Sequence, residues 1–149
     1  MEGDHPQRIE ALKKRSEFFS PYNYGTLLTN LFDKVGVGLP IVVMVFDMQT
    51  LLIHKITDNC KDIWGYKKEE MEWMDISKLI HHDDLAKSIE LADQSALSGI
   101  EITSYKNRHF NKAGKVVYLM WETVKTFNYL SLVFCWQITK DQFEDLEYK

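Results

Sequence analysis

The chain is predicted to be an α+β protein, with one five-stranded antiparallel sheet and helices stacked mainly on one of its faces. The hydrophobic pattern changes along the chain from helical spacing to β-rich runs, then to helix formers, then back to β-rich runs. This order of two helices, two strands, a helical cluster and three strands favours segregated helices on an antiparallel sheet. The 149 residues are 45% hydrophobic and 27% charged, with only 7 Gly and 3 Pro, so we expect one domain.

The first 38 residues are helical in character. Apolar residues at spacings of three and four form a narrow stripe between Ile9 and Phe19 that includes Leu12. After a break at residues 20–25, a wider apolar face includes Leu27 and Leu31, and two glycines then end the helix. We therefore expect residues 1–38 to form a helical cap or dimerisation segment.

The next two segments are predicted to pair as a hairpin. Residues 41–46 and 51–56 are apolar and β-rich, and residues 47–50 make a polar turn between them. Residues 58–93 contain helix formers and carry an acidic excess, which indicates several short helices followed by a longer one over about 83–97. Asp83 or Asp84 is expected to cap the first turn of that helix.

The last part of the chain returns to strands. Residues 100–110, 116–126 and 130–138 are predicted strands, separated by turns at 113–114 and 127–128. Residues 139–149 are predicted to begin another helix.

Composition excludes several classes of protein. No apolar run approaches the ~20 residues of a membrane span, and the start lacks the regions of a signal peptide, so a cytoplasmic protein without a membrane anchor is expected. Cys60 and Cys135 are too few for a disulfide framework or a thiolate metal cage. A net charge of −4 argues against direct nucleic-acid binding.

Four segments of the chain carry recognisable motifs: Ile63-Trp-Gly-Tyr-Lys-Lys-Glu-Glu-Met71, Ile80-His-His-Asp-Asp84, Tyr105 to Gly114, and Gln137-Ile-Thr139. Together, in this order and at these separations, they resemble the motifs of PAS domains. The resemblance covers roughly residues 39–142, and the family's usual residues are replaced at Thr57, His82, Ala113 and Gln137.

The resemblance implies a PAS fold over residues 39–140, with residues 141–149 starting an output helix. PAS domains are sensory and interaction modules whose hollow, between sheet and helices, holds haem, flavin, a metabolite or nothing, so the cofactor stays unassigned. By this resemblance the chain is an input domain that binds a small molecule or mediates dimerisation and passes a signal to a C-terminal effector. We expect the chain to be a piece of such a larger regulator, either a transcription factor or a histidine kinase.

Strand alternation, aligned with the family, selects the side chains that face the hollow. The expected ligand-binding residues are Tyr105, Asn107, His109, Leu119, Trp121, Thr123, Val133 and Cys135. The opposite face of the last strand is too apolar to be left in water. We therefore expect a homodimer, or alternatively intramolecular packing of a helix on the sheet; the expected dimerisation residues are Leu12, Leu27, Leu31, Leu132, Phe134 and Trp136.

His109 with Asn107 is the most informative inward pair. These two side chains could bind a polar ligand, His109 could ligate haem or another metal, or the pair could be satisfied within the protein. The predicted helix over 83–97 has no His for a haem, and residues 73–80 have no Cys for a flavin adduct, by comparison with family members that bind these groups.

The remaining candidates have simpler explanations. The run from His81 to Asp84 is interpreted as a loop and helix cap, so no metal site is predicted. Cys60 is interpreted as a small residue on a polar helix and Cys135 as a buried thiol in a reducing cytoplasm, with redox sensing by the pair as the alternative. No catalytic residue is assigned.

Two other functions stay open. An enzyme of the small curved-sheet isomerase or dehydratase type would use Asp47, Glu122 or His109 as acid or base, although no inward carboxylate is expected beside His109. A ligand-free dimerisation module would need its inward polar residues to be satisfied by one another.

Overall fold

A computed structural model of the chain describes residues 41–98, 104–127 and 129–145. The predicted helices before residue 39, the first residues of the strand predicted over 100–110, and Asn128 of the turn predicted at 127–128 lie outside these ranges.

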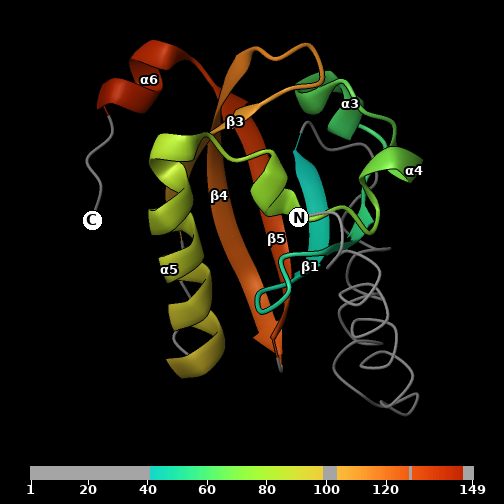
Figure 1. Ribbon diagram of the computed structural model, residues 1–149, viewed down its shortest axis with the longest axis vertical. Helices are drawn as coiled ribbons and strands as arrows, with labels where there is room; N and C mark the ends of the chain where they lie inside the picture. The colour runs from blue at the N-terminus through green and yellow to red at the C-terminus, as the bar shows by residue number, and fades with distance from the viewer. Residues whose placement is uncertain (1–40, 99–103, 128, 146–149) are drawn as a thin grey trace.

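The described residues confirm an α+β fold built on a five-stranded antiparallel sheet (Figure 1). The strands are β1 (Val42–Asp47), β2 (Ile53–Ile56), β3 (Tyr105–Phe110), β4 (Val116–Phe127) and β5 (Leu130–Ile138). Their spatial order is β2-β1-β5-β4-β3, so the two long strands β5 and β4 lie between the β1–β2 hairpin and β3.

The β1–β2 hairpin is held by a buried carboxylate. The Asp47 Oδ1 atom accepts hydrogen bonds from the backbone N–H groups of Gln49 (2.7 Å) and Thr50 (2.9 Å). An Asp at this position of a turn satisfies backbone donors that would otherwise be buried without a partner. The polar turn predicted between residues 47 and 50 is thus present, with Asp47 fully buried inside it.

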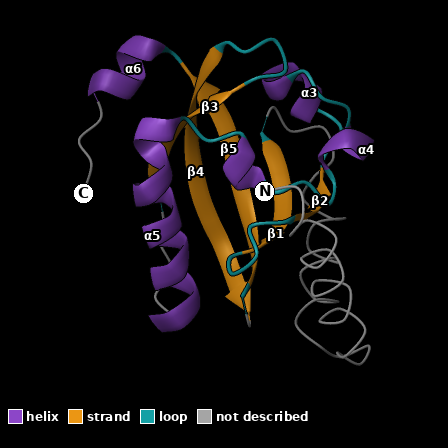
Figure 2. Ribbon diagram, in the orientation of Figure 1, coloured by secondary structure: helices purple, strands orange, loops and turns teal. Residues whose placement is uncertain are grey.

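Helices cover the sheet on one face (Figure 2). In chain order these are α3 (Cys60–Trp64), α4 (Lys68–Met71), a short 3₁₀ helix (Ile76–Lys78) and the 17-residue helix α5 (His82–Ser98). Helix α3 ends at Gly65, whose φ of 77° suits glycine, and a Cβ there would lie 3.4 Å from Lys112 Cβ. The cluster of short helices and the longer one agree with the pattern of residues 58–97.

The start of α5 differs in detail from the prediction. The backbone N–H of Asp83 donates to Nδ1 of His81 (3.1 Å), so the histidine supplies the local cap rather than either aspartate. Asp84 instead faces the sheet and bonds Arg108 of β3. The sequence favours Asp as a cap, but the long-range partner on β3 is not visible to a local rule.

The sheet separates two apolar clusters. The larger one lies between the sheet and the helices and contains Trp64, Leu119, Trp121 and Cys135, while a smaller one on the other face contains Val43, Val45, Leu52, Leu130 and Leu132. Neighbouring residues of β5 therefore point to opposite faces, as strand alternation requires. Among the described residues, no helix is both long and apolar enough to cross a membrane.

The chain leaves the sheet through a short helix, α6 (Lys140–Asp145). The Thr139 hydroxyl accepts a hydrogen bond from the Gln142 N–H (3.1 Å), and the Gln142 side chain accepts one from the Thr139 N–H (2.9 Å). This reciprocal pair is a capping box, which satisfies two orphan donors at the helix start. The helix predicted from residue 139 therefore begins where the sequence places it.

Candidate functional site

The hollow between α5 and the sheet is almost filled. A cavity of about 20 Å³ remains there, which is room for a single water molecule. Four of the eight residues predicted to bind a ligand line it: Tyr105, Asn107, His109 and Trp121. The cavity wall also includes Phe46, Leu51, Ile76, Ile80, Ser88, Ile89 and Ala92, which the strand pattern alone did not select.

The other four predicted residues do not line the cavity. Leu119, Val133 and Cys135 are buried in the same apolar cluster and act as packing. Thr123 is also buried, and its hydroxyl oxygen has no hydrogen-bond partner among the described residues.

His109 is buried in a neutral form. Its Nδ1 atom accepts a hydrogen bond from Nε1 of Trp64 (3.1 Å), so the ring proton lies on Nε2. Burial lowers the pKa of His109 to about 3, and the charge of Asp84 only partly opposes that shift. With 1% of its surface exposed, the imidazole can offer the hollow one N–H donor and no charge.

Asn107 connects the sheet to α5. Its Oδ1 atom accepts a hydrogen bond from Nε1 of Trp121 (2.6 Å), and its Nδ2 atom donates to the Ser88 hydroxyl (3.0 Å). All three side chains are buried, so each bond replaces hydration that the group loses on folding. The chain Trp121–Asn107–Ser88 therefore anchors α5 on the inner face of the sheet.

Aromatic rings fill the space around these bonds. The Trp121 ring lies 5.5 Å from the His109 ring, 6.3 Å from that of Trp64 and 6.0 Å from that of Tyr105, which stacks on it nearly parallel. Such separations are within the range of favourable aromatic packing. The interior polar set is thus uncharged and nearly satisfied by its own members.

Sequence reasoning missed two members of this set. Trp64 was assigned only to a family motif, and its indole N–H turns out to be the partner of His109, 45 positions away. Ser88 is a small polar residue within the apolar side of the predicted helix, and that position was the available signal.

The two carboxylates named for the enzyme alternative do not lie beside His109. Glu122 is exposed on the face of the sheet away from His109, and Asp47 is held in its turn by two backbone N–H groups. General acid–base chemistry needs a group within hydrogen-bond reach of a reacting proton, with a second group to orient or relay it. The geometry therefore does not support the isomerase or dehydratase alternative.

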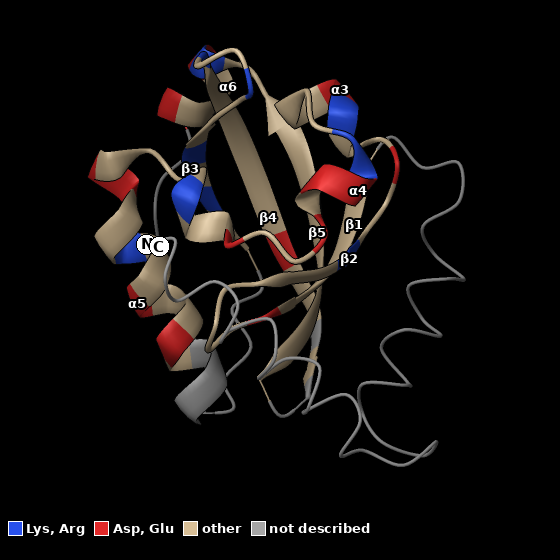
Figure 3. Cartoon of the chain, turned by 45° about the vertical axis from the view of Figure 1, so that its right-hand side comes forward, with Lys and Arg blue, Asp and Glu red and all other residues tan. Residues whose placement is uncertain are grey.

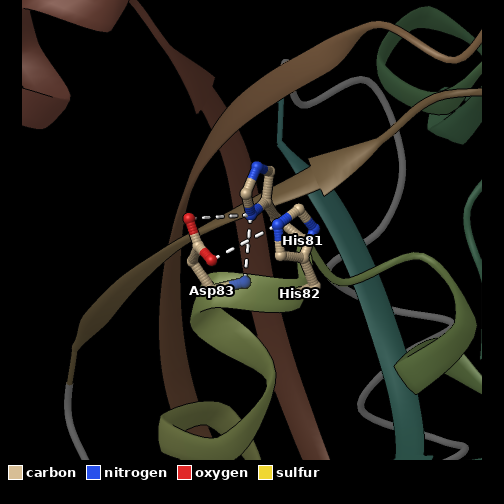
Figure 4. Close-up of side chains that lie close together, drawn as sticks. All are labelled: His81, His82 and Asp83. Carbon is tan, nitrogen blue, oxygen red and sulfur yellow. Dashed lines mark hydrogen bonds and ion pairs between the residues drawn. The ribbon is translucent and has the colours of Figure 1, made fainter.

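The cluster of His81, His82 and Asp83 at the start of α5 has ligand atoms within 4.8 Å of one another (Figure 4). The two imidazole rings are stacked, with centroids 4.3 Å apart and planes 23° apart. Lone pairs in the planes of stacked rings run side by side rather than converging on one ion. His81 Nδ1 already accepts the Asp83 N–H, so the arrangement explains itself as a cap.

The two cysteines lie in environments that disfavour thiolates. Burial raises the pKa of Cys60 to about 11, with the charge of Asp58 adding to the effect, and burial raises that of Cys135 well above its usual range. Since the thiolate is the reactive form, neither residue has the character of a redox sensor.

The outer face carries a second, open feature. A groove of about 600 Å³ is lined by Ile41, Asp62, Ile63, Glu122, Phe134, Trp136 and Gln137. Phe134 and Trp136 are two of the predicted dimerisation residues and are partly exposed, whereas Leu132 is buried in the smaller apolar cluster. The predicted dimerisation residues Leu12, Leu27 and Leu31 lie outside the described residues.

No protein-family model matches the sequence, and no curated protein sequence matches it significantly. Solved structures do match. A PAS domain from Colwellia psychrerythraea is 19% identical, with 76% of this chain and 98% of that chain covered and a TM-score of 0.59. The N-terminal domain of a diguanylate cyclase with PAS/PAC sensor from Marinobacter aquaeolei is 13% identical, with 68% and 98% covered and a TM-score of 0.58.

A third similar structure was solved with a bound molecule. The PAS domain of the Cronobacter turicensis RpfR quorum-sensing receptor, in complex with BDSF, is 12% identical, with 70% of this chain and 100% of that chain covered and a TM-score of 0.59. At these identities the likeness establishes the fold, and the function must be argued from this chain's own residues.

Proposed function

We propose that this chain, which has the PAS fold, is a sensory input domain that receives a signal in the hollow under α5 and delivers it through α6. The observation that supports this most is the buried set of uncharged polar side chains that joins α5 to the sheet. Asn107 of β3 holds Ser88 of α5, and His109 of the same strand faces the cavity beside them. A molecule that entered the hollow would have to rearrange these bonds, and with them the position of α5.

The chemistry of the hollow limits what such a molecule could be. No charged side chain lines the cavity among the described residues, and His109 is neutral. Placing a charged ligand there would cost several kcal/mol of desolvation without a partner to offset it. We therefore propose an uncharged or largely apolar ligand, with one acceptor for the N–H of His109.

The described state is the closed one in this proposal. A cavity of about 20 Å³ is far below the ~300 Å³ of an ordinary ligand site. A ligand must therefore bind a second packing of α5 more tightly than this one, because only such differential binding shifts an equilibrium. Two of the similar structures are complexes of the Cronobacter RpfR PAS domain with BDSF and with C12:0, which supports a small molecule as the ligand of a domain with this fold.

The outer groove supports a second function, self-association. Phe134 and Trp136 are aromatic, partly exposed and close to the start of the described chain at Ile41. Partly buried aromatic residues of this kind are the usual anchors of protein interfaces. The homodimer predicted from the sequence, and an effector continuing from α6, remain parts of this proposal.

Native mass spectrometry of the purified chain, before and after denaturation, tests the ligand directly. The proposal predicts a small co-purifying or added apolar molecule whose binding is weakened by His109→Gln. The control is His54→Gln, because His54 is a partly buried histidine that lies on β2 and does not line the cavity. Equal loss in both variants, or no molecule bound by the wild type from any mixture of apolar metabolites, would contradict the proposal.

Sedimentation equilibrium tests the dimer. We expect self-association in the micromolar range that is lost in Trp136→Glu and retained in Val124→Glu, which adds the same charge at an exposed position of β4 that does not line the groove. A monomeric wild type at several hundred micromolar would remove this second function.

A further inference from the structure

We infer that Arg108 couples helix α5 to helix α6, because its guanidinium is bonded to Asp84 at the start of α5 and lies against the Phe143 ring of α6. This inference specifies a route from α5 to the C-terminal helix, so its biological meaning rests on the proposed function. The coupling itself is a property of the folded chain and can be measured without ligand or effector.

The first half of the route is a three-bond contact. Arg108 donates to the Asp84 carboxylate from Nη2 (2.8 Å), from Nε (2.9 Å) and from its own backbone N–H (2.8 Å). The side chains are 29% and 19% exposed, so the pair is partly screened from water. A forked arginine–carboxylate pair fixes orientation as well as distance. Arg108 also accepts the His81 N–H at its backbone oxygen (2.8 Å), which ties the same strand residue to the residue before α5.

The second half of the route is the set of contacts around the Phe143 side chain of α6. The Phe143 ring lies 5.2 Å from the Tyr118 ring, 4.5 Å from the Lys106 ammonium and 5.8 Å from the centre of the Arg108 guanidinium. The Lys106 ammonium also donates to the Phe143 backbone oxygen. Tyr118 is the direct cross-strand neighbour of Arg108, so ring and cation form one surface on β3 and β4. Figure 3 shows the basic positions of β3 in blue and the acidic positions of α5 in red.

The Arg108 guanidinium takes part in both contacts, so a change at Asp84 also affects Phe143. The pKa of Asp84 is held below its usual value because the Arg108 bonds outweigh the opposing effect of burial, and the pKa of Arg108 is raised mainly by the same carboxylate. If α5 moves and Asp84 withdraws, the guanidinium loses the partner that fixes it beside Phe143. The guanidinium then no longer has a fixed position beside the Phe143 ring, and the packing of α6 on the sheet weakens.

A second ion pair in the same domain provides a matched control. Lys112, in the turn after β3, bonds Glu70 of α4 at 3.1 Å. It joins the helical cluster to the same β3–β4 hairpin, but among the described residues no hydrogen bond, ion pair or ring contact joins Lys112 or Glu70 to α6. If losing any ion pair on this hairpin affected α6, removing the Glu70 charge would have the same effect as removing the Asp84 charge.

Double-mutant cycles on the full chain test the coupling. The equilibrium constant of unfolding in urea is measured for the wild type, Asp84→Asn, Phe143→Ala and the double variant, and for the corresponding cycle with Glu70→Gln. We expect the first cycle to depart from additivity by about threefold to tenfold and the second by less than about twofold. Because the cycle cancels whatever each single change does to stability alone, a purely structural role of Asp84 would leave it additive.

If Asp84→Asn does not fold, the cycle with Arg108→Lys replaces it, since Lys keeps the charge but loses the fork. Additive behaviour in the Asp84 or Arg108 cycle, or equal coupling in the Glu70 cycle, would overturn the inference. The two proposals can fail separately. If a ligand binds but the cycles are additive, only the coupling through Arg108 is contradicted. If the cycles are coupled but no ligand binds, only the proposed sensory function is contradicted.

Discussion

Two neighbouring residues of β3 hold helix α5 from opposite sides of the sheet edge, and they do so with different chemistry. Asn107 bonds Ser88 in the dry interior, whereas Arg108 bonds Asp84, one helical turn earlier, at the partly exposed rim. The inner contact is neutral and touches the cavity, while the outer one is charged and touches α6. A ligand in the hollow would therefore disturb the Asn107–Ser88 bond first. The resulting movement of α5 would reach α6 through the Arg108–Asp84 pair.

Substitutions in the inner region should lower the free energy of unfolding more than substitutions at the rim. Trp64→Ala removes a fully buried ring and leaves the Nδ1 atom of His109 without its donor. We expect a loss of about 3–5 kcal/mol in the free energy of unfolding, measured by urea titration. Trp64→Phe keeps most of the ring volume and loses only the N–H, so it should cost about 1–3 kcal/mol. Equal costs for the two variants would mean that the bond alone, and not packing, matters at this position, and no cost for Trp64→Phe would mean that packing alone matters.

The inner region should also respond to mild acid through His109. Its pKa is about 3 when folded and about 6.5 when unfolded, so the unfolded chain binds the extra proton between these values. Stability from this group is complete above pH 6.5 and is lost as the pH falls, at up to about 1.4 kcal/mol per pH unit. Urea titrations at pH 7.5 and 5.0 should give a loss of about 2 kcal/mol in the wild type.

His109→Gln should show a much smaller loss between the same two pH values. His54→Gln should keep most of it, although the pKa of His54 is also lowered, by burial and then by Lys55. A wild-type stability that does not change between pH 7.5 and 5.0 would contradict a neutral, buried His109.

The outer region should give smaller effects. Asp84→Asn breaks a partly exposed charged pair, and we expect a loss of about 1–2 kcal/mol at pH 7. Because the pKa of Asp84 is lowered in the folded state, its contribution is present above the unfolded value near 3.9 and is lost as the pH falls through the folded value. The gap between wild type and variant should therefore close below about pH 4.

Glu70→Gln is the control for that measurement. The Glu70 carboxylate is exposed, and its pKa is lowered, first by the Lys67 backbone and then by Lys112. No resolvable change in stability is expected, because exposed ion pairs contribute little. A loss as large as that of Asp84→Asn would remove the distinction between the rim contact and an ordinary surface pair.

Within the described residues, the sequence was sufficient to predict the helices and strands and which face of the sheet each strand residue points to, because these follow from local patterns. The alternation along β3 placed Asn107 and His109 toward the helices, and the observed core agrees with that facing. The partners of these residues could not be predicted in the same way. Trp64 and Ser88 reach them across 45 and 19 positions, and such pairings depend on how the short helices pack.

The volume of the hollow could not be predicted from the sequence either. Inward polar residues suggested room for a ligand, but whether tryptophan rings fill that room depends on their rotamers in the packed core. The same limit applies to Asp84, where a local rule predicted a cap and a long-range arginine determined the contact instead.

Amide hydrogen exchange of wild type and Ser88→Ala tests most directly whether the hollow and the C-terminal helix communicate. Removing the Ser88 hydroxyl leaves Asn107 Nδ2 without that acceptor and loosens only the inner anchor of α5. The account predicts faster exchange in α5 and, in parallel, at the Phe143 amide, which donates to the Thr139 oxygen at 2.9 Å. Faster exchange in α5 with an unchanged rate at Phe143 would contradict it.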